Sequence, residues 1–303
     1  MNRTDMIFDL SSIWAAVKEI FPYFERLDFD WDEQYRVYLE KILNVQDEAA
    51  FHQLLTEFME SLHDGHTKYI PPDAYRTEKP FVRPDVPSCA MQDGVLTIKL
   101  NEFLQDHSAY VRELLEKNPD ATMVRLDIRD NIGGNTFYAA KVAELFIPGV
   151  FHGCRKWTQI HKAVDMAASS QIARYSEERI RQYIRDGLME EKEVDEAKRM
   201  MGHMNYEHYT DTFGAEGQRA VYEGPLEILI SKNTMSAAED FTAMFRSNHR
   251  GTLVGEPTFG STGTPYKIPL RCGGRAQVVS VGYRLLDGME FIGKGIEPDV
   301  VSG

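Results

Sequence analysis

The second part of the chain alternates short apolar runs with amphipathic segments, and this pattern limits its fold more than any other feature. The strand-like runs are residues 94–100, 122–128, 225–230 and 251–256. Helical patterns at three- and four-residue spacing lie between them. Such alternation is typical of βαβ units around a mainly parallel sheet. The sequence therefore predicts an α/β domain over residues 93–303, with a late hairpin that turns at residues 272–274.

Three other regions depart from this alternation. Residues 1–70 have helical periodicity and predict an N-terminal helical subdomain. Residues 71–92 contain five prolines and predict an extended linker. Residues 155–215 interrupt the alternation, and their charged stretch at 170–202 predicts a helical insertion that packs on the sheet or covers a cleft.

Bulk properties exclude several classes of function. The net charge of −13 over 303 residues disfavours nucleic acid and anionic membranes as partners. No apolar run approaches the roughly 20 residues of a membrane span, and Asp5 and Asp9 interrupt any signal-like start. We therefore expect a cytoplasmic protein. Three scattered cysteines without a CxxC pair predict reduced thiols, and no cofactor or metal is expected.

The segment SKNTMSAAEDF, residues 231–241, contains a serine that has two interpretations. Ser236 and Glu239 form the Ser-x-x-Glu pattern of a helix capping box. Alternatively, Ser236 is a nucleophile at the carboxyl end of a strand, where ligands bind in open α/β sheets. The backbone N–H of Ala237 would then face the oxyanion, because the first helical turn has unpaired donors.

A second segment, LDIRDNIGGNT at residues 126–136, brings paired glycines after another buried strand. Gly133 and Gly134 allow close approach of a ligand to the backbone, as an oxyanion hole requires. A plain tight turn is the alternative. A phosphate loop is disfavoured because the GxGxxG and Lys-Ser/Thr signatures are missing.

A third segment, SLHDGHTKY at residues 61–69, places His66 after a helix-ending glycine. There it is a candidate general base for a serine across the cleft. A surface histidine is the ordinary alternative, and a metal shared by His63 and His66 lacks further ligands of known spacing.

These stretches, taken in order, resemble the C-terminal-processing (tail-specific) serine peptidase family. The matching stretches are LHDGHT, LDIRDNIGG, YEGPLEILISKNTMSAAEDF, LVGEPTFGSTG and GKGIEPDV. The resemblance is to its branch with the tricorn core and the interphotoreceptor retinoid-binding protein repeats. It implies a ClpP/crotonase-like fold, a β-α superhelix, as the core.

The resemblance also implies a role for individual residues. Ser236 would be the nucleophile, with Ala237 and Gly133 or Gly134 forming the oxyanion hole. The better-known enzymes use a lysine 25 residues after the serine, where this chain has Ser261. The tricorn-like branch uses a histidine instead, which matches His66.

Further implications concern the residue that orients the histidine. In the tricorn-like branch this is a glutamate before the final G-[IV]-x-P-D motif. Glu290 is the nearest match here, with Asp287 as the alternative. Gly65 stands where the tricorn core has an auxiliary serine, so that interaction is missing.

The expected substrate is a peptide or protein. The linker is too short for the PDZ domain that captures substrate tails in many relatives. Recognition is therefore expected in the cleft, at Thr258, Gly260 and Ser261, and by strand addition to the segment that follows them. Two alternatives remain open: an esterase or amidase on small substrates, and a non-catalytic carrier of apolar ligands. The sequence gives no signal for an oligomeric state.

Overall fold

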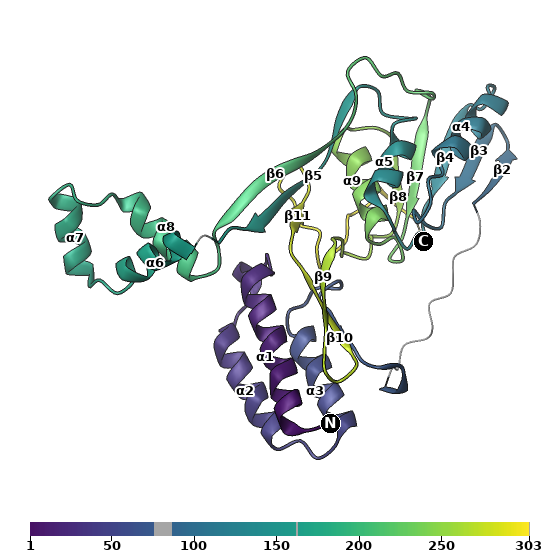
Figure 1. Cartoon of the computed structure of the whole chain (residues 1–303). Coiled ribbons are helices and arrows are strands. Elements are labelled where there is room, and N and C mark those ends of the chain that lie inside the picture. Colours follow the sequence, from purple (N-terminus) through teal and green to yellow (C-terminus); the bar gives the residue numbers. More distant parts are fainter. Residues whose placement is uncertain (76–86, 162, 303) are drawn as a thin grey trace.

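The computed structural model describes residues 1–75, 87–161 and 163–302. Its core is a six-stranded sheet in the order β12-β8-β7-β4-β3-β2 (Figure 1). Strands β3, β4, β7, β8 and β12 run parallel, and β2 pairs antiparallel with β3 at one edge. The strands are β2 (Ser88–Gln92), β3 (Val95–Lys99), β4 (Met123–Asp127), β7 (Leu226–Ile230), β8 (Thr252–Gly255) and β12 (Val300–Val301). The mainly parallel sheet is as the sequence predicts.

Helices connect the parallel strands, as expected for βαβ units. They are α4 (Ser108–Lys117), α5 (Thr136–Ala143) and α9 (Ala237–Ser247). Helix α9 is buried at every position from Ala237 to Phe245, and it packs against α5. A helix that is buried all round lies inside the domain, so its N-terminus is fixed by packing on several sides.

The N-terminal region is helical between Arg3 and Glu60, whereas the end of the predicted range, Lys68–Ile70, is a strand. It contains α1 (Arg3–Ile20), α2 (Trp31–Leu43) and α3 (Glu48–Glu60), with a short 3₁₀ turn η1 (Phe24–Arg26) after α1. The side chains of Asn2, Asp30 and Asp47 cap the three helices by accepting backbone N–H groups. Their apolar faces contribute to the same core as the sheet.

A small second sheet joins this helical region to the core. Its order is β1 (Lys68–Ile70), β10 (Arg275–Val279) and β9 (Pro265–Pro269), and its β9–β10 hairpin is the one that the sequence predicts. The buried Asp9 of α1 accepts the N–H groups of Arg271 and Cys272 at 2.8 and 2.9 Å. Because β1 pairs with β10, the segment that carries His66 lies beside the last part of the chain.

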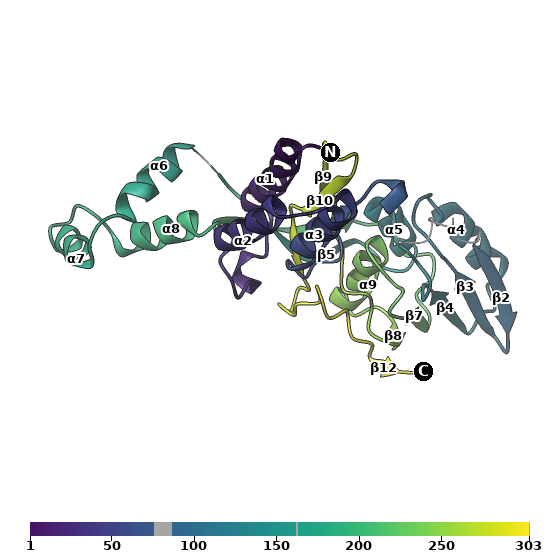
Figure 2. The ribbon, with the colours of Figure 1, turned by 90° about the horizontal axis from the view of Figure 1, so that it is seen from below.

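A third sheet, β11-β5-β6, carries the insertion. Strands β5 (Val150–Gln159) and β6 (Tyr206–Gly214) form a long hairpin, and β11 (Gly282–Arg284) pairs with β5. Helices α6 (Ala163–Ile172), α7 (Glu177–Arg185) and α8 (Glu191–Met201) lie at its far end (Figure 2).

This arrangement corrects the expectation for residues 155–215. The region is not helical throughout, because both arms of its base are strands. Figures 1 and 2 show that its helices stand away from the six-stranded sheet rather than on it. Helices α6 and α8 pack against each other instead. Helix α8 is amphipathic, and its buried Val194, Ala197 and Met200 lie on one face, so contact with a single neighbour is enough to bury them.

The predicted linker is also partly different. Residues 88–92 form β2, and residues 73–75 form a 3₁₀ turn η2 (Asp73–Tyr75). The remainder of that prediction, residues 76–86, lies outside the described residues. Within the described ranges, no helix combines the length and the apolar character needed to cross a bilayer.

Candidate active site

Ser236 stands at the N-terminus of α9, directly after the loop that follows β7. Its backbone has φ +57° and ψ −128°, in the left-handed half of conformational space. A non-glycine residue held there costs about 1–3 kcal/mol and is found mainly at functional sites. The capping interpretation holds as well, since the Glu239 carboxylate accepts the Ser236 N–H at 3.3 Å. Ser236 therefore begins the helix with a strained, half-buried backbone position.

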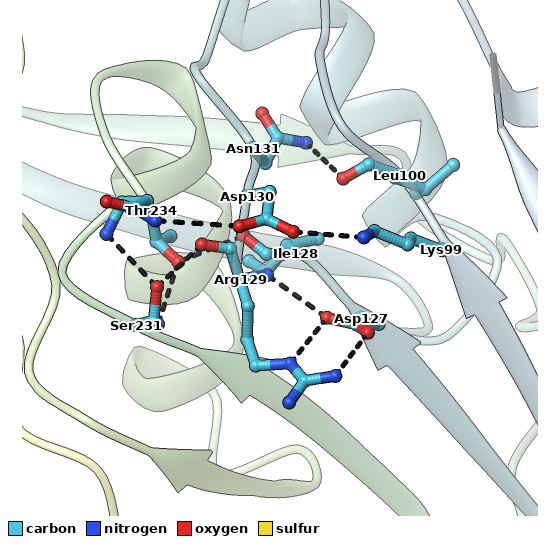
Figure 3. Close-up of polar contacts among 10 residues, drawn as sticks. Lys99, Leu100, Asp127, Ile128, Arg129, Asp130, Asn131, Ser231 and Thr234 are labelled. Carbon is cyan, nitrogen blue, oxygen red and sulfur yellow. Dashed lines mark hydrogen bonds and ion pairs between the residues drawn. The ribbon is translucent and has the colours of Figure 1, made fainter. Parts of the chain in front are cut away.

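Hydrogen bonds tie the loop before Ser236 to the glycine loop after β4 (Figure 3). The Thr234 hydroxyl donates to the Ile128 carbonyl at 2.9 Å, and the Ser231 hydroxyl donates to the Arg129 carbonyl at 2.6 Å. The Met235 N–H donates to the Asn131 carbonyl at 3.1 Å. The two loops at the carboxyl ends of neighbouring strands therefore form one unit.

Charged and amide side chains support the other side of the glycine loop. Asp127 accepts two hydrogen bonds from the Arg129 guanidinium, at 2.9 and 2.7 Å. Asp130 pairs with Lys99 at 2.9 Å. The Asn131 amide donates to a carbonyl of the adjacent strand segment at 2.9 Å (Figure 3). The loop backbone is held before any ligand binds, as preorganised donors require.

The glycine loop lies against the serine. A Cβ on Gly133, whose φ is +86°, would stand 2.6 Å from the Cβ of Ser236 and 2.9 Å from the Ala237 nitrogen. The Gly133 N–H already donates to Asn131 Oδ1 at 2.9 Å. Among the described residues, the N–H groups of Gly134 and Ala237 have no hydrogen-bond partner. Of the three predicted oxyanion donors, these two are the available ones.

His66 lies in the loop between α3 and β1, and it contacts two serines. Its Nε2 is 3.3 Å from Ser236 Oγ, and its Nδ1 is 2.5 Å from Ser261 Oγ. The structure thus brings together a serine and a histidine that are 170 positions apart in sequence. No group of three or more His, Cys, Asp or Glu side chains in the described part of the chain is arranged to hold a metal ion.

Burial and a nearby carboxylate act in opposite directions on the His66 imidazole. Burial is the larger effect and lowers its pKa, while the charge of Asp64 raises it. Asp64 accepts the N–H groups of His66 and Thr67 at 3.0 and 2.7 Å. A lowered pKa keeps the imidazole neutral near pH 7, so that it is ready to accept a proton.

Ser261 has a different place from the one expected. It is 1% exposed, its hydroxyl contacts His66, and its carbonyl accepts the Ser236 N–H at 3.0 Å. A Cβ on Gly65 would approach the Ser261 Cβ to 2.9 Å. A serine at position 65 would therefore need the space that Ser261 occupies, which accounts for the glycine there.

Glu239 holds the serine and the Ser261 loop together. Its fully buried carboxylate accepts the Thr258 hydroxyl at 2.6 Å and the N–H groups of Gly260 and Ser261 at 2.7 and 2.8 Å. The fourth bond is the one from the Ser236 N–H. Burial raises the pKa of Glu239 to about 7, although these hydrogen bonds oppose the shift. From sequence, Glu239 is predicted only as part of a helix cap.

Thr258 and Gly260 are internal supports, which corrects their expected substrate-binding role. Both are buried, and both donate to Glu239. The Thr258 hydroxyl also accepts the Ile296 N–H at 2.7 Å. A Cβ on Gly260 would stand 2.7 Å from the Gly295 nitrogen, so backbone rather than ligand fills this space.

Glu290 does not contact His66, contrary to expectation. Its carboxylate pairs with Arg26 at 3.5 Å and with Arg284 at 3.9 Å. Asp287, the alternative, accepts the N–H of Met289 within its own turn. The Nδ1 atom of His66 is occupied by Ser261 instead. Sequence distance to the final motif gave no information about where these carboxylates lie in space.

A comparison with protein-family models identifies the family of this chain. The model for peptidase family S41 matches residues 94–302. The chain belongs to peptidase family S41. This confirms the family expected from the sequence motifs, and with it the serine-type peptidase class.

Curated relatives of this S41 chain include processing enzymes. A probable CtpA-like serine protease of Staphylococcus aureus is 24% identical over 209 residues, which are 68% of this chain and 32% of the relative. The chloroplastic C-terminal processing peptidase of Tetradesmus obliquus is 29% identical over 90 residues, 30% of this chain and 19% of the relative. The matches thus span a third or less of the length of these relatives.

Solved structures confirm the α/β fold at low identity. A putative peptidase from Parabacteroides merdae has a TM-score of 0.71 at 16% identity, covering 100% of this chain and 90% of that one. Mature CPAF complexed with lactacystin has a TM-score of 0.67 at 11% identity, with coverage of 99% and 94%. The photosystem II D1 C-terminal processing protease has a TM-score of 0.57 at 13% identity, with coverage of 98% and 92%.

Proposed function

We propose that this S41 member hydrolyses peptide bonds of polypeptides through an acyl-enzyme, with Ser236 as nucleophile and His66 as general base. The observation that carries the proposal is the 3.3 Å contact between His66 Nε2 and Ser236 Oγ at a strained helix N-terminus. A serine needs such a neighbouring base, because its hydroxyl is a weak nucleophile on its own.

In the proposed reaction, Ser236 Oγ attacks the carbonyl carbon while its proton passes to Nε2. The oxyanion that forms is bound by the N–H groups of Gly134 and Ala237. The positive end of the α9 dipole favours the same charge. The imidazolium then gives the proton to the departing amine. In the second half, His66 takes a proton from water, the water oxygen attacks the acyl carbon, and the proton returns to Ser236 Oγ as the acid leaves.

Base catalysis at Nε2 requires the tautomer with hydrogen on Nδ1. Ser261 Oγ lies 2.5 Å from that atom and accepts the hydrogen, so a hydroxyl does what a carboxylate does in the Ser-His-Asp arrangement. A charged carboxylate is nevertheless close by. The charge of Asp64 raises the pKa of His66 and so favours the imidazolium form. Ser261 is accordingly a positioning residue in this proposal.

Ser261→Ala tests that role. Without the acceptor, the Nδ1–H tautomer and the ring orientation lose support, and we expect kcat to fall about 10- to 100-fold with little change in KM. Steady-state kinetics on one peptide provide the measurement. Thr210→Ala, at an exposed position of β6, is the control. A change in KM alone would assign Ser261 to substrate binding instead.

The substrate class is tested with a panel of fluorogenic peptides beside short-chain acyl esters. The peptidase proposal predicts peptide turnover by the parent chain and none by Ser236→Ala. Ester turnover without peptide turnover would favour an esterase. Absence of both, in a protein that binds apolar ligands, would favour the carrier.

A further inference from the structure

A cavity of about 440 Å³ without Ser236 in its lining lies where the turn after α1, the end of the β5–β6 hairpin next to the insertion helices, and β11 meet. Three arginines from separate elements line it: Arg26 of η1, Arg199 of α8 and Arg284 of β11. Trp157, Tyr206 and His208 form its flat walls. We call this cavity the arginine pocket. Its positive lining contrasts with the chain's net charge of −13.

The acidic residues of the arginine pocket leave its positive charge incompletely paired. Glu290 lies 3.5 Å from Arg26 and 3.9 Å from Arg284, at ion-pair rather than hydrogen-bond distance for the second. Glu25 also lines the cavity, but within the described residues neither it nor Arg199 forms an ion pair. Glu290 is 41% exposed at its side chain, so it is a loosely held counter-charge.

One arginine of the pocket has an unfavourable strand pairing with an arginine that does not line it. Arg284 of β11 is directly opposite Arg155 of β5 in an antiparallel pair. Like charges in this position destabilise a sheet. The Arg284 guanidinium is held 4.4 Å from the centre of the Trp157 ring, which keeps it facing the pocket walls. A bound anion would offset the repulsion between the two arginines.

Two buried polar atoms of the pocket also lack partners. Within the part of the chain that the structure describes, Arg284 Nε and the Tyr206 hydroxyl are buried and accept or donate no hydrogen bond. Leaving such a group unpaired costs about as much as a lost hydrogen bond, so it usually indicates a missing ligand or water. Both atoms belong to residues that line the same cavity.

We propose that the arginine pocket binds a carboxylate of a peptide, either its C-terminus or an acidic side chain. Guanidinium groups bind planar carboxylates through paired hydrogen bonds, and three arginines line this one cavity. The bound carboxylate replaces Glu290 as the partner of Arg26 and Arg284. The proposal rests on the proposed function in one respect: it takes the ligand to be a peptide.

The position of the pocket suits a substrate-holding role. Tyr23 lines the pocket, and its hydroxyl accepts the Tyr283 N–H at 3.0 Å. The Tyr283 ring stands 3.4 Å from where a Cβ on Gly263 would lie. Gly263 is two residues from Ser261. Tyr283 thus contacts both a residue of the pocket and the loop that contains Ser261.

Binding is measured by calorimetry on the full chain carrying Ser236→Ala, so that no peptide is cleaved. The probes are three N-acetylated Gly/Ser/Leu decapeptides: one with a free C-terminus, one with a C-terminal amide, and an amidated one with a single internal Glu. We expect at least one carboxylate peptide to bind at least tenfold more tightly than the neutral peptide. The first and third probes distinguish a terminal from a side-chain carboxylate.

Variants locate the binding. Arg284→Gln and Arg199→Gln should each weaken carboxylate binding about tenfold or more, and Glu290→Gln should strengthen it by removing the competing carboxylate. Arg199 is exposed on its helix, so its variant keeps the test valid if Arg284→Gln folds poorly. Arg36→Gln, which removes an exposed arginine of α2, is the matched control.

Equal binding of the carboxylate and neutral peptides would overturn the proposal, as would no binding of any of them. Unchanged binding in both arginine variants would do the same. Failure of the proposed function has a different signature, because chemical labelling of Ser236 does not involve this pocket. Carboxylate binding without a reactive serine would leave the pocket assigned and refute the peptidase.

Discussion

His66→Ala is expected to lower kcat/KM by roughly 10⁴–10⁶-fold, about as much as loss of the serine itself. The reason is that no other base can take the Ser236 proton at hydrogen-bond distance: in the described residues, His66 Nε2 is the side-chain atom that contacts Ser236 Oγ. The two residues act as a unit, so Ser236→Ala and the double variant should have similar residual activity.

His63→Ala is the matched control for this change. His63 is exposed, three positions earlier in the same loop, and outside the contacts of Ser236. Peptide hydrolysis by the control should equal that of the parent. Circular dichroism should show that the parent, His66→Ala and His63→Ala are all folded. Undiminished hydrolysis by folded His66→Ala would refute the Ser–His pairing.

Glu239→Ala is expected to destabilise the fold by about 3–5 kcal/mol, as for the breaking of a buried charged network. The carboxylate accepts four hydrogen bonds. Its loss leaves the Thr258 hydroxyl and the N–H groups of Gly260 and Ser261 without this partner in the interior, whereas the Ser236 N–H keeps the Ser261 carbonyl. The same change frees the Ser261 loop, so activity should also fall at temperatures where the protein stays folded. Urea unfolding measures the first effect. Glu113→Ala, at an exposed helical position, is the control.

The pH dependence of stability gives this residue a separate signature. The folded-state pKa of Glu239 is about 7, above its ordinary value of 4.5, because burial penalises the charged form. The folded state therefore binds more protons between pH 4.5 and 7, and its contribution to stability is lost as pH rises through about 7. The loss amounts to about 3 kcal/mol. Glu239→Gln should remove this part of the slope; an unchanged slope would contradict the assignment.

The sequence predicted the parts of the site that depend on local chain geometry. Ser236, the paired glycines and His66 each follow a recognisable strand or helix end, and such ends determine which backbone groups are exposed. Their meeting in space needed the family resemblance, because 170 positions separate His66 from Ser236. The parallel sheet and the β9–β10 hairpin were likewise predictable, from the periodicity of apolar residues and from the turn residues.

The errors came from contacts that no local pattern encodes. Glu290 was assigned by its distance to the final motif, but its position depends on how η1 and β11 pack, which brings Arg26 and Arg284 to it. Ser261 was predicted as the residue that replaces a lysine and as part of the substrate-binding cleft, not as a partner of His66. Its proximity to His66 follows from the β1–β10 pairing and from the missing side chain at Gly65.

The packing of the insertion helices also could not be predicted from local sequence. Charged amphipathic helices are compatible with packing on a sheet and with packing on one another, and the structure has the second arrangement. The boundaries drawn at residues 70 and 92 and the cytoplasmic location stay predictions from sequence.

The most direct measurement is covalent labelling with a fluorophosphonate, followed by mass-spectrometric mapping of the modified residue. The account predicts one adduct per chain on Ser236, strongly reduced in His66→Ala and retained in His63→Ala. No adduct on Ser236, under conditions in which a control serine hydrolase is labelled to completion, would contradict it.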